Sequence, residues 1–594
     1  MKKSEYRLWK NRIERPYEAF LLERQADYQP NRKETLPADY CMAVKASGKL
    51  HEHAESLIAE WIAKQSGPDF IYCDEDCIDE KTGERSHPFL KPEWSPDTLE
   101  SFFYPGGLVA MKRELVERAV RESGMACDLQ SPDFLYECAV RAEAVSHLPL
   151  ILYHSYEVCG YQYKRKHHVT DGLQTVPYDR TQKISIVILS KDNPSMLERC
   201  VSSIRKYSGE AVTELIVIDN GSSRENTGKA EALSAKFDFY YERIPMDFLY
   251  SSLCNIGASK ASGSFLLFMN DDVEVPCENG FLLKMLEKAS DPHTGAVGVK
   301  LLYPESKRIQ HVGITDLAVG PSHKLATFPD DSDYYYGRNR YTYNVLAVTG
   351  ACLMVEKQKF DEIGGFDEAL FVSYTDVDLC TDLLERGYRN VVLNDVFLYH
   401  HESVSRGNDI LDDAKRRRMN RERDYYYGKH PFLKEKGDPY YHRNLTPWKL
   451  EYEPDVLMPW EDIRQMAEPV EGRRICDAGP SVCASVDSVR QTPDYYEAEG
   501  WIFRKQRSGL RYEPGVVLLA DGKEVCYTAV RRYRKELPEV FPGERQIDLS
   551  GFICRIPRQN IEDVRSAGIE ACLYPMHSRK CYAKRESLKG VIDG

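Results

Sequence analysis

Three short apolar runs, each followed by polar residues, mark the middle of the chain. They cover residues 184–189, 215–218 and 265–269. Short runs that are apolar on both faces are typical of buried parallel strands. Residues 196–207 and 251–262, which lie between these runs, have a helical pattern. Alternation of strands and helices predicts right-handed crossovers and an open α/β sheet.

The pattern changes after about residue 451. Residues 499–503, 515–520, 525–530 and 550–556 are short and β-rich, and Asp521-Gly522 is a turn signal. This spacing predicts an antiparallel sandwich. We identify no acid pair or metal cluster in the sequence of this segment. We expect residues 451–594 to form an accessory domain that docks a glycan, a partner or a membrane, or else a purely structural cap.

Length and composition limit the class of protein. A chain of 594 residues with 42% hydrophobic and 29% charged residues is expected to form two to four globular domains. A formal net charge of −13 argues against non-specific nucleic-acid binding. The 17 cysteines form no pair of CxxC knuckles with zinc spacing, which fits reduced thiols in the cytosol better than a disulfide framework.

Targeting signals are weak. The sequence MKKSEYRLWKNRIERPYEAF has a positive start but no apolar stretch after it, and no run approaches the roughly 18 apolar residues of a membrane span. We therefore expect a soluble cytoplasmic protein. Peripheral contact with the inner face of the cytoplasmic membrane, through a patch or a partner, stays open.

Polar side chains follow all three predicted strands. Ligands of open α/β sheets bind at the carboxyl ends of the strands. A nucleoside diphosphate needs acceptors for its base and ribose, and oxygen ligands for a metal on its phosphates. The residues placed to supply these groups are Ser190, Asp192, Asp219, Asn220, Asp271 and Asp272.

Asp272 is the candidate metal ligand at the third strand end. A hard divalent cation prefers carboxylate oxygens and keeps positions open for phosphate oxygens. The alternative is that Asp271 and Asp272 only cap a turn or the next helix.

A series of motifs resembles an inverting family 2 glycosyltransferase of the GT-A type. The motifs are ISIVILSKDN, ELIVIDNGS, CNIGASKASGSFLLFMNDDVE, AVTGACLMV, IGGFDEALFVSYTDVDLC and LYHHESVSRG, in the order that the family has them. Residues 179–450 are thus similar to the catalytic domain of large bacterial enzymes of O-antigen and related surface-polysaccharide synthesis, some of which are rhamnosyltransferases.

The resemblance implies roles for individual residues. Asp219 would contact the nucleoside, and Asn255 and Gly257 would shape the donor pocket. Asp272 would be the metal-binding aspartate of the DxD-like element, with Asp271 beside it, and the metal would be Mg²⁺ or Mn²⁺. His400 matches the histidine that completes metal or diphosphate binding, while the adjacent histidine, residue 401, stays open as the ligand.

Asp376 matches the general base of the family. An inverting transfer needs a carboxylate that takes the proton of the acceptor hydroxyl. Alternatively, Asp376 and Asp378 are acids at a helix N-terminus, where the helix dipole favours them. Asp378 is expected to hold the local structure. Asp382 stands where the family often has a basic residue, which puts acceptor identity or rate in doubt but not the fold.

Two further segments have open interpretations. Tyr334, Tyr335 and Tyr336 could stack on acceptor sugars or belong to a packed loop. Residues 415–418 (KRRR) could meet a lipid diphosphate or an anionic membrane, or form the solvated face of a helix.

Residues 1–178 resemble the latter part of a transferase domain. The matching segments are DFIYCDEDCIDEKTGERSHPFLKPEWSPDTL and HLPLILYHSY. Where the metal acids should stand, the chain reads Lys45, Ala46, Ser47 and Gly48, and the nucleotide-binding strands have no room before them. We expect a degenerate, inactive α/β domain in which the carboxylates of residues 74–76 hold a loop through backbone hydrogen bonds.

The sequence thus predicts an enzyme that moves a sugar from a UDP-, dTDP- or GDP-sugar to a glycan or a lipid-linked saccharide. A nucleotidyltransferase needs a Gly-rich basic phosphate loop, which SKDNPSM is not, and a nicotinamide enzyme needs a GxGxxG turn. The alternative from another class is a non-catalytic sugar- or partner-binding scaffold that has kept the fold.

Overall fold

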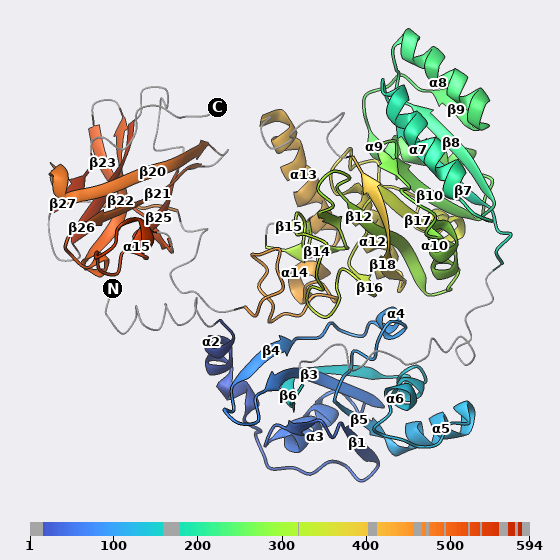
Figure 1. The fold of residues 1–594 in the computed structure, drawn as a ribbon, viewed down its shortest axis with the longest axis horizontal. Coiled ribbons are helices and arrows are strands. Elements are labelled where there is room, and N and C mark those ends of the chain that lie inside the picture. Colours follow the sequence, from blue (N-terminus) through green and yellow to red (C-terminus); the bar gives the residue numbers. More distant parts are fainter. Residues whose placement is uncertain are drawn as a thin grey trace. The chain divides into compact units, whose positions relative to one another are not determined.

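A computed structural model describes residues 16–584, except 158–178, 319, 402–412, 456–465, 471–473, 492–494, 521–522, 535–536, 558–567 and 576–579. Contacts divide the chain into two compact units (Figure 1). The first contains residues 24–455, and the second contains residues 456–594 together with the first 23 residues. Each unit is described by itself.

The larger unit is built on a ten-stranded mixed sheet, here called the central sheet. Its main path runs β11-β18-β12-β17-β10-β7-β8-β9, with β13 beside β12 and β16 beside β18. The strands are β7 Ile184–Ser190, β8 Thr213–Asp219, β9 Tyr240–Arg243, β10 Phe265–Asn270, β11 Val273–Glu274, β12 Thr294–Leu302, β13 Ile309–His311, β16 Thr342–Val345, β17 Cys352–Glu356 and β18 Arg389–His400. A separate hairpin joins β14 Ile314–Leu317 and β15 Gly320–His323.

The helices of the central part of the chain are α7 Pro194–Tyr207, α8 Arg224–Phe237, α9 Tyr250–Lys260, α10 Phe281–Ala289, α11 Lys357–Glu362, α12 Thr375–Glu385, α13 Asp413–Lys429 and α14 Phe432–Lys436. The described helices are too short or too polar to cross a membrane.

The predicted α/β sheet is confirmed. Strands β7, β8 and β10 are parallel neighbours and follow the three apolar runs, and α7 and α9 follow the two helical patterns. The register pairs Ser190 with Asp219 and Asn270 with Leu189. The three polar strand ends therefore meet at one edge of the sheet, as the strand-end rule requires.

A six-stranded sheet, the N-terminal sheet, precedes the central sheet in the same unit. Its strands are β1 Tyr40–Val44, β2 Gly48–Leu50, β3 Phe70–Ile78, β4 Arg85–Phe89, β5 Leu108–Lys112 and β6 Val145–Ser155. Its helices are η1 Gln25–Tyr28, α3 Ala54–Lys64, α4 Pro96–Leu99, α5 Arg113–Ser123 and α6 Pro132–Ala139, and α2 Pro16–Glu23 precedes them in the chain.

The N-terminal sheet repeats the second half of the central sheet. The antiparallel pairs β1·β5, β3·β5, β2·β6 and β3·β4 correspond to β10·β17, β12·β17, β11·β18 and β12·β13. The parallel pair β3·β6 corresponds to β12·β18. In the described residues nothing corresponds to β7, β8 and β9, which carry two of the three polar strand ends.

The repeat also shows what stands in the place of Asp272. Lys49 pairs with His154 in the N-terminal sheet, just as Val273 pairs with His400 in the central sheet. Gly48 therefore occupies the position of Asp272. The copy has a histidine, His154, near the end of its last strand, but β2 places no carboxylate opposite it; its ring contacts Asp76 on β3 instead, at 2.6 Å.

The acids of residues 74–76 hold loops through backbone hydrogen bonds, as the sequence predicts, because Asp74 accepts from the N–H of Lys91 and Glu75 from the N–H of Gly107. They lie within β3, where all nine residues are buried. Asp74 also lies 2.9 Å from Nε2 of both His147 and His442. Burial opposes a charged imidazole, but Asp74 and Glu93 raise the pKa of His147 to about 9.

His442 contacts the other oxygen of the same carboxylate. Its Nδ1 accepts a hydrogen bond from the backbone N–H of Asn444 at 3.0 Å. Its Nε2 lies 2.9 Å from Oδ2 of Asp74, and these two buried atoms have no other partner among the described residues. The acids of β3 thus belong to a buried network of charges and hydrogen bonds that ties β3, β6 and the segment after α14 together.

Asp97 joins the two sheets. Its carboxylate, 2% exposed, lies 3.1 Å from Nζ of Lys288 on α10 and 2.9 Å from Nε of Arg389 on β18. Asn344 on β16 donates a third contact at 2.8 Å. Burial alone would raise the pKa of Asp97, but the two cations outweigh it and hold the pKa at about 2.

The second unit is a two-sheet sandwich, as the sequence predicts. One sheet has the order β19-β27-β26-β22-β23 and the other β20-β21-β25-β24. All pairs are antiparallel except β19·β27. Residues of both sheets, such as Tyr496 and Val516, share one apolar core.

The strands of the sandwich are β19 Arg474–Asp477, β20 Val482–Gln491, β21 Tyr495–Arg504, β22 Tyr512–Ala520, β23 Lys523–Thr528, β24 Val530–Arg532, β25 Gly551–Pro557, β26 Gly568–Pro575 and β27 Lys580–Ala583. Short helical turns are η3 Gly479–Ser481, η4 Gly509–Arg511 and α15 Leu537–Val540.

The Asp97 junction gives a stability prediction. Asp97→Ala leaves two buried cations without their shared partner, so we expect a loss of about 3–5 kcal/mol in the free energy of unfolding. Denaturant unfolding of the full chain measures it. The exposed pair Glu225–Lys229 provides the control, because Glu225→Ala should leave the midpoint unchanged.

The same junction has a defined pH dependence. The pKa of Asp97 is depressed in the folded protein, so its contribution is complete above the ordinary aspartate pKa of about 4 and declines as the pH falls towards 2. An equal unfolding midpoint for Asp97→Ala and the unaltered chain at neutral pH would contradict this account.

Candidate functional site

The site begins at the ends of β7 and β10. The hydroxyl of Ser190 donates a hydrogen bond of 2.6 Å to Oδ2 of Asp271. Burial, with the neighbouring Asp272, raises the pKa of Asp271 to about 7 despite this hydrogen bond. Two adjacent carboxylates in a buried turn favour a cation that offsets their charge.

Asp272 lies against the end of β18. The backbone N–H of His401 donates to the carbonyl of Asp272, and Val273 pairs with His400. Nε2 of His400 lies 3.0 Å from Oδ1 of Asp272, and these residues are 9% and 8% exposed. The short strand β11 thus brings a carboxylate and an imidazole together from distant parts of the sequence.

Gln310 on β13 fixes the orientation of His400. Its Oε1 lies 2.6 Å from Nδ1 of His400 and can only accept, so Nδ1 carries the proton. The amide of Asn270 lies 3.3 Å from Nε2, which fits a nitrogen with a lone pair. Nε2 therefore presents a lone pair to Oδ1 of Asp272.

This arrangement fits a divalent cation. Oδ1 of Asp272 is buried and has no hydrogen-bond partner among the described residues. Two electron-rich atoms 3.0 Å apart need a proton or a cation between them. Imidazole and carboxylate oxygens are suitable ligands for Mn²⁺, and a histidine whose other nitrogen is held by hydrogen bonding is typical of metal sites.

His401 has a different partner. Its Nε2 lies 2.9 Å from Oε2 of Glu274 and 3.5 Å from Arg199. Of the two adjacent histidines, His400 is therefore the one that could hold a metal ion together with Asp272.

Asp219 and Asn220 lie side by side at the end of β8. Asp219 accepts hydrogen bonds from the backbone of Ser222 at 2.6 Å and from the hydroxyl of Tyr241 at 2.7 Å. The amide nitrogen of Asn220 donates to the carbonyl of Met246 at 2.8 Å. Its Oδ1 is buried without a hydrogen-bond partner in the described chain, so it could accept from a nucleoside.

Two other candidate residues, Asp192 and Asn255, form hydrogen bonds within the fold. Asp192, with a φ of 53°, accepts from the backbone of Ser223 and from the amide of Asn226. Asn255 exchanges hydrogen bonds with the backbone of Phe366.

Gly257 is required where α9 crosses β7. A Cβ added at this glycine would lie 2.3 Å from Cγ1 of Val187. Asn255 and Gly257 thus position α9 and the loop after α11.

Asp376 is linked to the end of β10 through the backbone. It lies in the first turn of α12, and its Oδ2 accepts from the N–H of Gly350 at 2.7 Å. The carbonyl of the following residue, Ala351, accepts from the N–H of Asn270 at the end of β10. Two hydrogen bonds thus connect Asp376 to the strand end that precedes Asp271 and Asp272.

Asp378 and Asp382 form a cluster with a cation from α13. Nζ of Lys429 lies 2.8 Å from a carboxylate oxygen of each, and Nε2 of His430 lies 2.9 Å from Asp378. Asp382 stands where the family often has a basic residue, and in the structure Lys429 supplies positive charge next to it. Asp378 joins α12 to α13, in line with the structural role that the sequence indicated.

The tyrosine segment packs on the N-terminal sheet. The ring of Tyr336 stacks on Phe89 at 3.8 Å between centroids, and the hydroxyl of Tyr335 contacts the backbone of Leu90. These two rings belong to a packed loop. Residues 415–418 lie in α13, and the side chains of residues 415–417 are outside the description.

Residues 185–364 match the family model described as glycosyl transferase family 2, so this part of the chain belongs to that family. Strands β8 to β17 and the acids at the ends of β7, β8 and β10 lie within this match, whereas Asp376 and His400 lie beyond it.

Two curated relatives extend the similarity beyond this domain. The O-antigen biosynthesis protein RfbC of Myxococcus xanthus is 31% identical over 448 residues, which cover 69% of this chain and 34% of the relative. The uncharacterized protein y4gI of Sinorhizobium fredii is 31% identical over 442 residues, which cover 67% and 47%. The chain thus spans between a third and a half of the length of these relatives.

A shorter match is to an N-acetylglucosaminyl-diphospho-decaprenol L-rhamnosyltransferase of Mycobacterium tuberculosis, 37% identical over 62 residues, which cover 10% of this chain and 20% of the relative.

The contact between Gln310 and His400 gives a prediction for metal affinity. Gln310→Ala frees the imidazole to rotate and to change tautomer, so we expect Mn²⁺ binding to weaken about 10–100-fold. Electron paramagnetic resonance of free Mn²⁺ measures the affinity. His401→Ala is the matched control and should bind Mn²⁺ like the unaltered chain, whereas a greater loss in His401→Ala than in Gln310→Ala would contradict the assignment.

Proposed function

We propose that this protein is an inverting glycosyltransferase that moves a sugar from a nucleotide-sugar donor to a saccharide acceptor. The observation that carries the proposal is the single sheet edge where Asp272 and His400 face each other and Asp376 is connected to β10. The family 2 match over residues 185–364 supports the reaction class.

The donor diphosphate would bind at this edge. Asp272 and His400 would hold Mg²⁺ or Mn²⁺, with Asp271 beside them and Ser190 fixing its carboxylate. When bound, this cation offsets the negative charge of the leaving nucleoside diphosphate. Asp219 and Asn220 would recognise the nucleoside. Asp192, Asn255 and Gly257 would shape the donor pocket through their contacts within the fold.

Asp376 would act as the general base. It lies in the first turn of α12 with its Oδ2 held by the N–H of Gly350, and the carboxylate would take a proton from the acceptor hydroxyl as the oxygen attacks the anomeric carbon. Attack from the side opposite the leaving group inverts the anomeric configuration.

The acceptor is proposed to be a glycan or lipid-linked saccharide of bacterial surface-polysaccharide synthesis. The similarity to an O-antigen biosynthesis protein and a short match to a rhamnosyltransferase support this class. Transfer to a lipid-linked acceptor would take place at the inner face of the cytoplasmic membrane.

The domain roles follow from the repeat. Residues 179–450 are proposed as the catalytic domain, residues 1–178 as an inactive partial copy that stabilises it, and residues 451–594 as an accessory domain. Gly48 in the place of Asp272 supports the lack of a metal centre in the copy.

A donor screen tests the proposal. The purified chain is mixed with UDP-, dTDP- or GDP-sugars and Mn²⁺ or Mg²⁺, and release of the nucleoside diphosphate is followed. We expect metal-dependent release from one donor, and its loss in Asp272→Asn. Donor binding without turnover on any acceptor would favour the non-catalytic scaffold, and no binding to any donor would contradict both.

Asp376→Asn separates catalysis from donor binding. Loss of a general base should reduce the rate of transfer about 10²–10⁴-fold while the donor still binds. Asp361→Asn, on the exposed face of α11, is the control and should keep full transfer. Equal transfer by Asp376→Asn and the control would exclude Asp376 as the base.

A further inference from the structure

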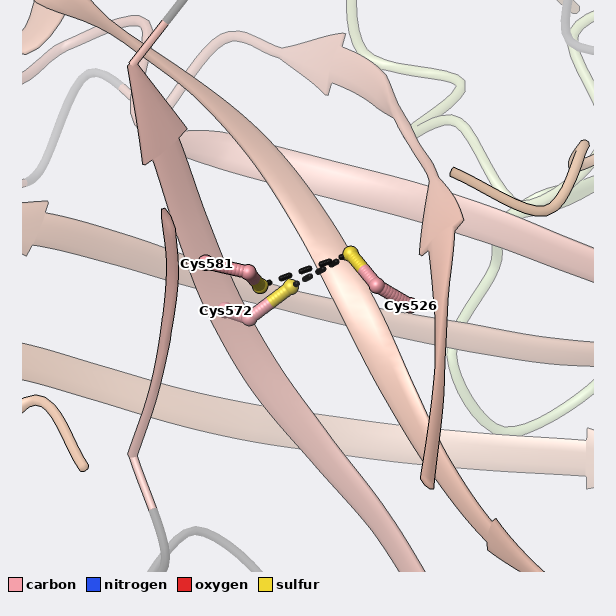
Figure 2. Close-up of side chains that lie close together, drawn as sticks. All are labelled: Cys526, Cys572 and Cys581. Carbon is pink, nitrogen blue, oxygen red and sulfur yellow. Dashed lines mark hydrogen bonds between the residues drawn. The ribbon is translucent and has the colours of Figure 1, made fainter. Parts of the chain in front are cut away.

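Three cysteines meet in the sandwich unit, remote in sequence from the strand-end site. Sγ of Cys526 on β23 lies 3.6 Å from Sγ of Cys572 on β26 and 3.4 Å from Sγ of Cys581 on β27. Figure 2 shows the three side chains pointing toward one another. The residues are 3%, 0% and 0% exposed.

Gly515 on β22 makes this meeting possible. Strand β22 lies between β23 and β26, and Gly515 pairs with Cys572 while Val517 pairs with Cys526. A Cβ at Gly515 would lie 3.1 Å from Sγ of Cys572, in the space across which the sulfurs approach. Strands that are not neighbours thereby place thiols in contact.

The side chains around the three sulfurs are almost entirely apolar. Val517, Tyr574 and Ala583 share their cluster, with Val470, Ile475 and Leu519 packed against it. Apart from the hydroxyl of Tyr574, these side chains offer no oxygen or nitrogen ligand. This donor set excludes hard cations such as Mg²⁺ and Ca²⁺, which need oxygen ligands.

The sulfur separations match a shared soft cation. The Zn–S bond is about 2.3 Å, so two sulfurs on one ion lie at most about 4.6 Å apart. On a tetrahedral ion the sulfurs would be about 3.8 Å apart. The distances of 3.6 and 3.4 Å are slightly shorter, and the three ligand atoms all lie within 4.8 Å of one another, so small side-chain shifts would admit one ion.

We propose that Cys526, Cys572 and Cys581 form a structural site for one soft d¹⁰ cation, Zn²⁺ or Cu⁺. Thiolate ligands select these ions over the harder divalent metals. Each thiol that becomes a ligand releases one proton to solvent, and no electron is transferred. The ion would fasten β23 to β26 and β27 across β22. This site is independent of the proposed transferase activity.

The test begins with metal bound to the full chain. Protein purified under reducing conditions without chelator is analysed by elemental mass spectrometry, and metal-free protein is then titrated with Zn²⁺, Cu⁺ and the probe Co²⁺. We expect about one Zn²⁺ or Cu⁺ per chain and a Co²⁺ charge-transfer band that only sulfur ligands give. The Asp272–His400 site has no sulfur and cannot produce that band.

Matched variants assign the signal. Cys526→Ser should abolish the band, because Cys526 contacts both other sulfurs. Cys554→Ser removes another buried thiol of the sandwich and should keep it. In the unaltered chain the favoured ion should also raise the unfolding temperature of the sandwich, which does not depend on any variant folding.

Three results would overturn the proposal. The first is the absence of tight Zn²⁺ or Cu⁺ binding by the unaltered chain. The second is a sulfur band that persists in folded Cys526→Ser. The third is a disulfide between any two of the three cysteines in protein purified without oxidant.

Discussion

The antiparallel pairing of β11 with the end of β18 is the contact on which the site depends. Strand β11 has two residues, yet it places Asp272 beside His400 and sets their side chains 3.0 Å apart. Without that register the acids at the end of β10 would have no imidazole opposite them. Gln310 then decides which nitrogen of His400 faces the carboxylate. The pairing of β11 with β18 and the hydrogen bond from Gln310 therefore place two electron-rich atoms opposite each other, an arrangement that favours a bound cation.

The N-terminal sheet shows the same pairing without the chemistry. Strands β2 and β6 meet in the register of β11 and β18, but Gly48 stands in the place of the carboxylate. Two kinds of contact join the copy to the central part: one buried apolar cluster contains residues of both, such as Phe89 and Tyr343, and Asp97 is shared by Lys288 and Arg389. Its aromatic and charged contacts contribute to stability, and the strands that it lacks, the counterparts of β7, β8 and β9, are present only once in the described chain.

Local patterns predict the elements well, because buried parallel strands are short, apolar and followed by the residues that line the site. The strands from 184 to 270, and with them Ser190, Asp219 and Asp272, follow from that rule. Gln310, Lys429 and the cysteine cluster do not, because each acts across a contact between elements distant in sequence. The sequence predicts that the acids of residues 74–76 hold a loop, but it does not show that they lie in a buried strand where His147 and Lys91 contact them.

Anomalous diffraction from crystals soaked in Mn²⁺ and a nucleoside diphosphate tests the central claim most directly. The account predicts one Mn²⁺ peak within about 2.0–2.3 Å of Asp272 Oδ1 and His400 Nε2, with phosphate oxygens in its remaining positions. A peak on His401 and Glu274 instead, or a diphosphate bound at the strand ends with no metal beside Asp272, would contradict it.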